Sequence, residues 1–196
     1  MALEKRPENS VARSQAAKTT TRLRSRRRAE QLLADDPGAL FEAVERAKQQ
    51  ERDYEFQIEG RRLLARRDRT TQGACALGAA QRRGRDLDGA LNSYRWALQQ
   101  DDSPRSNAMA HVGLAAALRE LGRLADAEEI LRSVLAADRR KHFAGVALAA
   151  VLMDRVEKRG DRDKLGEARR LLDSAWAASH RDAAINAAYG RLKSLE

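Results

Sequence analysis

The segment that decides the fold is Arg105–Asp138, which reads RSNAMAHVGLAAALRELGRLADAEEILRSVLAAD. In its second half, apolar residues recur every three or four positions, which places them on one face of an α-helix: Leu124, Ala127, Ile130, Leu131, Val134 and Leu135. The first half carries a similar stripe: Leu114, Ala115, Leu118 and Leu121. Gly122 fits the position just after a helix, where a positive φ is inexpensive only without a Cβ. The segment therefore predicts two antiparallel helices joined by a short turn.

Related helix pairs precede and follow this segment. When the pairs are aligned on a small residue early in each second helix, that residue is Ala90, Ala127 or Ala168, at intervals of 37 and 41 residues. Four residues later each pair has a bulky apolar residue: Tyr94, Leu131 or Leu172. The pattern predicts successive hairpins, each of which buries its apolar face against the next.

Over residues 71–179 this pattern resembles the tetratricopeptide repeat (TPR), a helix–turn–helix unit with small residues at fixed positions. A degenerate pair at residues 37–68 extends the resemblance, with Gly60 at the small-residue place. The sequence departs from the family where an early aromatic is expected, at Ala74, His111 and Ala149, and its intervals are long. We predict an all-α fold of antiparallel helix hairpins stacked as a TPR-like right-handed solenoid; an ordinary antiparallel helical bundle is the alternative.

The resemblance implies that the first helix of each pair lines a concave groove, which in this family usually holds a partner peptide or helix. In the first pair the inner-facing positions would be Gln72, Cys75, Ala79, Arg82 and Arg83. In the second pair they would be Met109, Val112, Ala116, Arg119 and Glu120. In the third pair they would be Ala147, Ala150, Asp154, Glu157 and Lys158. The alternative interpretation is that these residues pack against the chain's own arm or a neighbouring helix.

The net charge of +9 is concentrated at the ends of the chain. Residues 1–34 hold nine Lys and Arg against three Asp and Glu, and Arg22–Arg28 reads RLRSRRR. We predict a basic arm at residues 1–28, flexible or ordered by a partner, then N-terminal helices at 29–69 and a repeat domain at 70–196 that ends in a capping helix, Ala183–Leu195.

The arm could contact an RNA or DNA backbone, an acidic protein face or anionic lipid, or remain a solvated tail. The candidate residues are Lys18, Arg22, Arg24, Arg26, Arg27 and Arg28. No aromatic residues are interleaved with them for base stacking, and the arm has no apolar face of the kind that inserts into membranes.

The sequence contains no recognisable catalytic or metal-binding constellation. None of the three histidines has a second His or Cys at metal-ligand spacing, and Cys75 has no motif around it. His111 falls on an apolar helix face, which predicts a core residue. A single cysteine and the lack of an apolar run long enough to span a membrane predict a cytoplasmic protein.

These observations predict a non-enzymatic adaptor or scaffold without cofactor or metal, which binds a protein partner through its groove. The alternatives are a nucleic-acid-associated protein that docks through its arm, on the ribosome, RNA or DNA, or a subunit of a larger assembly.

Overall fold

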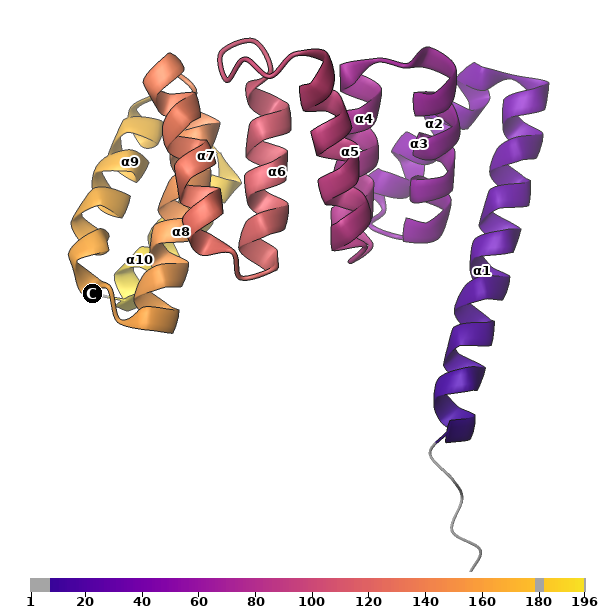
Figure 1. Ribbon diagram of the computed structural model, residues 1–196, viewed down its shortest axis with the longest axis horizontal. Helices are drawn as coiled ribbons and strands as arrows, with labels where there is room; N and C mark the ends of the chain where they lie inside the picture. Colours follow the sequence, from indigo (N-terminus) through magenta and orange to yellow (C-terminus); the bar gives the residue numbers. More distant parts are fainter. Residues whose placement is uncertain (1–7, 179–181, 196) are drawn as a thin grey trace, which may run out of the picture. The chain divides into compact units, whose positions relative to one another are not determined.

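The computed structural model describes residues 8–178 and 182–195, so the first seven residues of the predicted arm lie outside it. The described residues form ten α-helices and one short 3-10 helix, without a strand, in two compact units, Met1–Arg85 and Asp86–Glu196 (Figure 1). The first unit contains α1 (Glu8–Asp35), α2 (Pro37–Gln49), α3 (Tyr54–Asp68) and α4 (Thr71–Arg83). The second contains α5 (Leu87–Gln100), α6 (Ala108–Glu120), α7 (Leu124–Ala137), α8 (His142–Arg159), η1 (Arg162–Lys164), α9 (Leu165–Ala178) and α10 (Ala183–Leu195).

In the first unit, local sequence signals set the helix starts. The Asp36 side chain accepts a hydrogen bond of 2.8 Å from the Gly38 amide, and Pro37 takes the first helical position of α2. Thr70 caps α4 in the same way, by accepting a bond of 3.0 Å from Gly73. Residues 54–58, in which apolar and polar side chains alternate as in a strand, lie at the start of α3.

The core of the first unit lies where α2 and α3 meet the second half of α1. Leu40 and Val44 of α2 pack there with Phe56 of α3 and with Ala29, which is completely buried on α1. A Cβ at Gly60 would overlap the Val44 side chain, so α3 approaches α2 as closely as a glycine permits. Gly60, at the small-residue place of the degenerate pair, thus lies at a close approach of two helices.

In the second unit, α6 with α7 and α8 with α9 form antiparallel hairpins (Figure 1). Tyr94, Leu131 and Leu172 have exposed fractions of 3%, 1% and 0%, as the repeat pattern predicts. The small residues on which the pairs were aligned are all completely buried: Ala90, Ala127 and Ala168. Gly122, with φ at +79°, makes the predicted turn between α6 and α7.

One loop in each unit is closed by a buried side-chain amide. Gln57 Nε2 donates to the Ala47 carbonyl at 3.2 Å and to the Arg52 carbonyl at 2.7 Å. Asn107 Nδ2 donates to the carbonyls of Ala97 at 3.2 Å and Asp101 at 2.8 Å. In both loops the amide reaches a carbonyl ten residues earlier, which satisfies backbone groups that the end of a helix leaves without partners.

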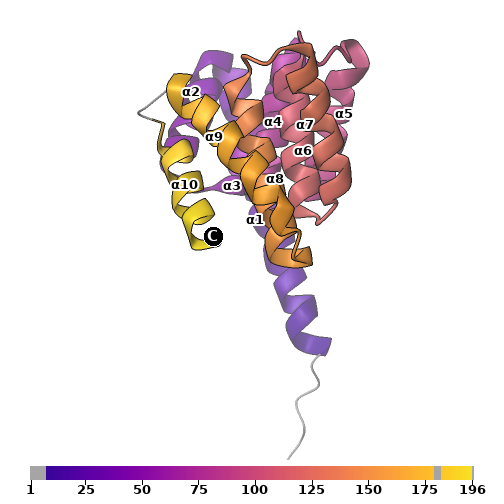
Figure 2. The same ribbon diagram turned by 90° about the vertical axis from the view of Figure 1, so that its left-hand side faces the viewer.

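The predicted capping helix is α10, and it packs against α8 and α9 (Figure 2). Ile185 and Leu192 are its buried anchors. On the α9 side, the Tyr189 ring meets Trp176 edge to face at 6.0 Å, and its hydroxyl donates a hydrogen bond to Asp173. Burial and this bond raise the pKa of Tyr189 to about 12, so the phenol stays a donor at neutral pH.

Candidate functional site

In the second unit, the predicted groove positions form one stripe on each of two adjacent helices. On α6, Met109, Val112, Ala116 and Arg119 follow one another at intervals of three, four and three residues, which keeps them on one helix face. On α8, Ala147, Ala150, Asp154 and Glu157 follow the same intervals. Helix α8 contacts both α6 and α10, so we name this surface the α6–α8–α10 face.

The apolar part of this face remains accessible. Met109 has an exposed fraction of 64%, the highest among the exposed large apolar residues of the described chain. Val112 and Ala116 of α6, like Ala147 and Ala150 of α8, are half-buried. A short apolar strip therefore lies open on this face without a covering helix among the described residues.

The C-terminal part of the face is a cluster of four charged side chains. The Asp154 side chain is only 12% exposed, and Arg119 Nε lies 3.2 Å from its Oδ2. From α10, Arg191 Nη2 donates to Asp154 Oδ1 at 2.7 Å. Arg191 also reaches Glu157, with Nε donating to Oε1 at 3.0 Å. Two arginines and two carboxylates thus neutralise one another between three helices.

Within this cluster, the bond between Arg191 and Glu157 favours the charged form of both side chains. The hydrogen bond from Arg191 holds the pKa of Glu157 below its ordinary value, and the same bond raises the pKa of the Arg191 guanidinium. A charged group of a partner would have to break one of these ion pairs in order to form an ion pair with the cluster. The cluster therefore favours a partner with complementary charge next to an apolar segment.

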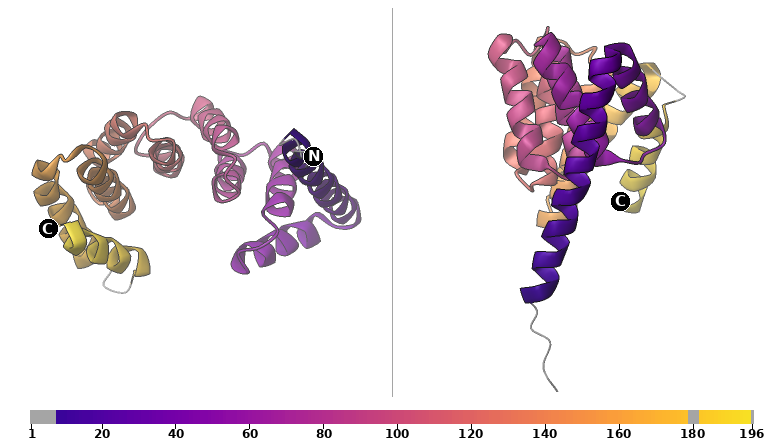
Figure 3. Two further views of the ribbon diagram at one scale, coloured as in Figure 1. Left: turned by 90° about the horizontal axis from the view of Figure 1, so that it is seen from below. Right: turned by 90° about the vertical axis from the view of Figure 1, so that its right-hand side faces the viewer.

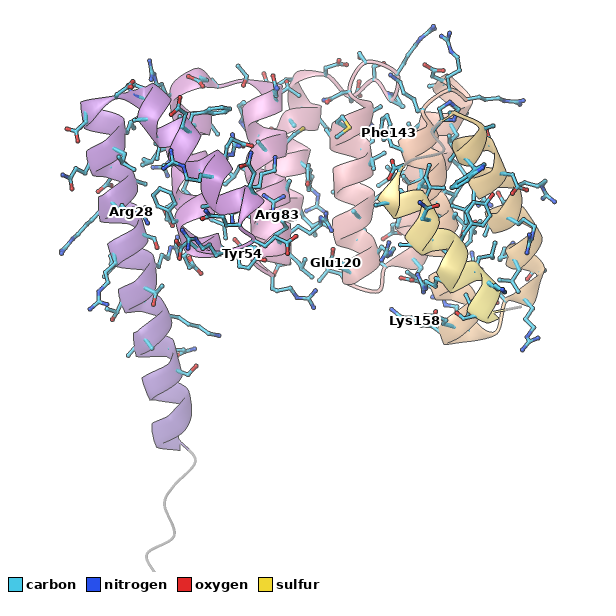
Figure 4. All side chains as sticks on the ribbon, turned by 180° about the vertical axis from the view of Figure 1, so that it is seen from behind. Arg28, Tyr54, Arg83, Glu120, Phe143 and Lys158 are labelled. Atoms are coloured by element: carbon cyan, nitrogen blue, oxygen red, sulfur yellow. The ribbon has the colours of Figure 1, made fainter. Side chains whose placement is uncertain are left out.

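Two further predicted residues lie near the same end of the unit. Glu120 and Lys158 are close to the C-terminal ends of α6 and α8, and Lys158 is exposed (Figure 4). Both lie beside the four-residue cluster in sequence, one position after Arg119 and Glu157 respectively. They remain candidate groove residues.

The predicted positions of the first pair lie on α4, in the other unit. Gln72 lines a pocket between α2, α3 and α4, together with Phe41, Arg61 and Leu64. Ala79 and Arg82 are half-buried, and Arg83 donates a hydrogen bond of 3.3 Å to Gln57. A groove that continues from α4 to α6 stays a prediction.

The six arm residues divide into two groups. Arg22 Nε lies 3.0 Å from Glu59 Oε1, and Arg28 stacks over the Phe56 ring at 4.4 Å, on the α3 side of α1 (Figure 4). Arg26 pairs with Glu30 on α1 itself, at 2.8 Å. All six are exposed, and the remaining three have no ion-pair partner among the described residues: Lys18, Arg24 and Arg27.

The residues weighed for catalysis and metal binding are in structural positions. His111 is buried, and its Nδ1 lies 3.1 Å from the Asn107 carbonyl oxygen, as expected of a core residue. Burial raises the pKa of the Cys75 thiol, which disfavours the nucleophilic thiolate. Within residues 8–178 and 182–195, no three His, Cys, Asp or Glu side chains gather as a metal site would need; His180 lies outside that part. None of the described helices is long and apolar enough to cross a membrane.

Sequence reasoning missed Arg191, which completes the charged cluster. One signal could have found it: Arg191 follows Asp154 by 37 residues, the same interval that separates Ala90 from Ala127. Arg119 likewise precedes Asp154 by 35 residues. Residues at equivalent positions on successive first helices lie on the same face of the repeat stack. Charged side chains one repeat interval apart are therefore expected to lie close together.

Comparison with known proteins agrees with this architecture. Residues 83–152 match a family model described as tetratricopeptide repeat. A tetratricopeptide repeat protein from Parabacteroides merdae is similar in structure, with a TM-score of 0.56 and 17% identity; the match covers 81% of this chain and 59% of that one. The TPR domain of Arabidopsis OM64 has a TM-score of 0.52 and 19% identity, over 64% of this chain and 96% of the domain.

The present chain thus spans little more than half of the Parabacteroides protein. The comparison with curated proteins gave no match. Low identity with agreement in fold is what repeat architectures produce, because the packing positions leave most of the surface unconstrained. The chain therefore has an all-α, helical-repeat fold like that of TPR proteins, and residues 83–152 are similar in sequence to the TPR family.

Proposed function

We propose that this protein is a non-enzymatic adaptor that holds a segment of a protein partner on the α6–α8–α10 face. The observation that carries the proposal is the open apolar strip at Met109, Val112 and Ala116, next to the ion cluster around Asp154. Apolar side chains supply affinity, whereas charged groups at one end fix orientation and register.

The side chains that line the face indicate which kind of partner segment it would bind. The strip has small floor residues, Ala116, Ala147 and Ala150, so a partner backbone can approach closely. A helix with apolar residues at every third or fourth position, or an extended segment, would match these stripes. At the end of the strip, a basic residue of the partner would compete with Arg191 for Glu157, and an acidic one would meet Arg119.

Site-specific photo-crosslinking tests this proposal and does not require the partner to be identified first. A photoreactive amino acid replaces Met109 in one variant of the full chain and Ser133 in another. Ser133 is an exposed residue of α7. Both variants are expressed in the native cell, irradiated and analysed by mass spectrometry of the cross-linked peptides.

We expect Met109 to cross-link reproducibly to one segment of one protein, and Ser133 not to. Adding Arg191→Glu to the Met109 variant should reduce that product, because it places a like charge beside Glu157 and disturbs the end of the strip. Equal products from both positions, or none from Met109, would contradict the proposed site.

A further inference from the structure

Helix α1 extends beyond the core of its unit as a basic rod. It is continuous from Glu8 to Asp35, but only its second half packs against α2 and α3 (Figure 3). Each residue from 14 to 24 is exposed, about three turns of helix that nothing in the described part of the first unit covers. Over residues 9–29 the sequence has seven Lys and Arg and no Asp or Glu.

Some of the arginines of α1 attach it to its own unit. Arg22 bonds Glu59, whose side chain is 4% exposed, and Arg28 lies over Phe56 and 3.9 Å from Asp53. These contacts fix the direction in which the rod leaves the core. Both arginines therefore already have partners within the first unit.

Three other cations of the rod have no such contacts, whereas Arg26 pairs with Glu30 on α1 itself. Lys18, Arg24 and Arg27 are exposed and have no ion-pair partner among the described residues. At about 100° per residue, Arg24 and Arg27 lie roughly 60° apart, on the side away from Ala29 and the core. Lys18 lies roughly 180° from Arg27, on the uncovered portion of the helix. The rod therefore presents positive charge on opposite sides.

From these features we infer that α1 binds the phosphodiester backbone of nucleic acid, through Arg24, Arg27 and Lys18. Charge alone can supply affinity for a polyphosphate chain, because each neutralised phosphate releases condensed counterions. Cations on opposite sides of one helix can reach both backbones that flank a groove. Arginine adds a planar fork that matches two phosphate oxygens.

A protein surface is a poorer fit to the same rod. Protein interfaces depend on buried aromatic and aliphatic anchors, and Leu23 is the one large apolar side chain described in the exposed part of α1. A membrane surface is disfavoured for the same reason, since an interfacial helix needs an apolar face to insert. Without aromatic residues in the rod, contact with bases by stacking is not available, so the binding tolerates any sequence.

This inference is separate from the adaptor proposal, because it concerns the other unit and other residues. The full chain is titrated into labelled nucleic acid, as a 20-base-pair DNA duplex, an RNA duplex of the same sequence and a single strand, with fluorescence anisotropy as the readout. The test variant is Arg24→Gln/Arg27→Gln. The matched control is Arg66→Gln/Arg67→Gln, which removes two exposed arginines from the last turn of α3 in the same unit.

At about 0.1 M salt we expect the test variant to bind roughly tenfold or more weakly than the wild type, with the slope of log K against log salt smaller by about 2. The control should stay within about twofold, and circular dichroism should show equal helix content in all three proteins. Comparison of the affinities for the three nucleic acids shows which form α1 binds most tightly.

Three results would overturn the inference. The first is an equal loss of affinity in the control variant, which would mean that net charge alone is responsible. The second is equally strong binding to polyglutamate of the same charge, which would indicate an acidic protein partner. The third is preferential binding to vesicles that contain phosphatidylserine, which would indicate a membrane surface.

Discussion

Arg191 on α10 and Asp154 on α8 are joined by a hydrogen bond of 2.7 Å between Nη2 and Oδ1. The bond ties the last helix of the chain to the α6–α8–α10 face, and Arg119 approaches the same carboxylate from α6. Since the Asp154 side chain is 12% exposed, its charge depends on these two guanidinium groups for compensation. Helix α10 is thus part of the candidate site.

Replacing Asp154 by alanine should destabilise the second unit. The substitution leaves Arg119 and Arg191 facing each other without the carboxylate that separates them. We expect the free energy of unfolding to fall by about 1–3 kcal/mol, in the range for hydrogen bonds to charged groups. Urea denaturation followed by circular dichroism measures the change.

The control for this variant is Glu157→Ala, which removes another carboxylate of the same cluster. The Glu157 side chain is 42% exposed, so its ion pair with Arg191 is screened by water. Its loss should cost at most about 1 kcal/mol. If both variants lost the same stability, Asp154 would not be the centre of the cluster.

Gly113 lies against Tyr94, whereas Gly190 has open space around it, so alanine substitutions at these two glycines should change stability in opposite directions. A Cβ at Gly113 would overlap the Tyr94 ring, so Gly113→Ala should destabilise by about 1–3 kcal/mol despite the better helix propensity of alanine. At Gly190 on α10 a Cβ has no neighbour within 4 Å, and Gly190→Ala should stabilise by up to about 1 kcal/mol. Thermal melting of the two variants should therefore shift in opposite directions, and shifts of the same sign would be evidence against this packing.

The small residue at Ala127 sets the distance between neighbouring helices. It is completely buried, so Ala127→Leu has to push α7 away from its neighbours, at a cost of about 1–3 kcal/mol. The matched change Ala125→Leu is on the exposed side of the same helix and should alter stability by less than about 0.5 kcal/mol. Comparison of the two denaturation midpoints checks the prediction, and an unchanged midpoint for the Ala127 variant would argue against the predicted close crossing.

Much of the fold follows from the spacing of small and bulky residues. Ala127 and Leu131, four positions apart, mark the buried side of α7, and the equivalent residues mark the buried sides of α5 and α9. Capping chemistry explains the start of α2 at Pro37, because Asp36 accepts a hydrogen bond from the Gly38 amide. These signals are local, so one sequence is sufficient to reveal them.

The candidate site depended on information that spacing alone does not carry. The resemblance to the TPR family put Arg119 and Asp154 at inner-facing positions, but their contact also requires the register between α6 and α8. Arg191 reaches the cluster only because α10 packs beside α8, which no local pattern of residues 183–195 indicates. Similarly, nothing in the RLRSRRR run distinguishes Arg22, which bonds a buried glutamate, from Arg24, which has no ion-pair partner among the described residues.

A second ion cluster, on α7, α8 and α9, leads to a prediction about pH. The Glu128 side chain on α7 is 6% exposed and accepts hydrogen bonds from Arg132 and from Arg155, the latter at 2.6 Å. Arg132 continues to Glu167 on α9, at 3.0 Å. Burial alone would favour the neutral acid, but the bonds from Arg155 and Arg132 outweigh it and hold the pKa of Glu128 below its ordinary value.

Because the pKa of Glu128 is lower in the folded chain than in the unfolded one, this carboxylate stabilises the fold above the unfolded pKa of about 4.3, and the stabilisation is lost as the pH falls through the folded value. Glu128→Gln should lower the free energy of unfolding by about 1–3 kcal/mol at pH 7. The difference from the wild type should hold down to about pH 5.5 and shrink between about pH 4.5 and pH 3. Urea denaturation at a series of pH values measures it, with the exposed neighbour Glu129→Gln as the control, whose stability should follow the wild type throughout. If the difference in free energy of unfolding between the wild type and Glu128→Gln stayed constant down to pH 3, the charge of Glu128 would contribute nothing to the packing of α7, α8 and α9.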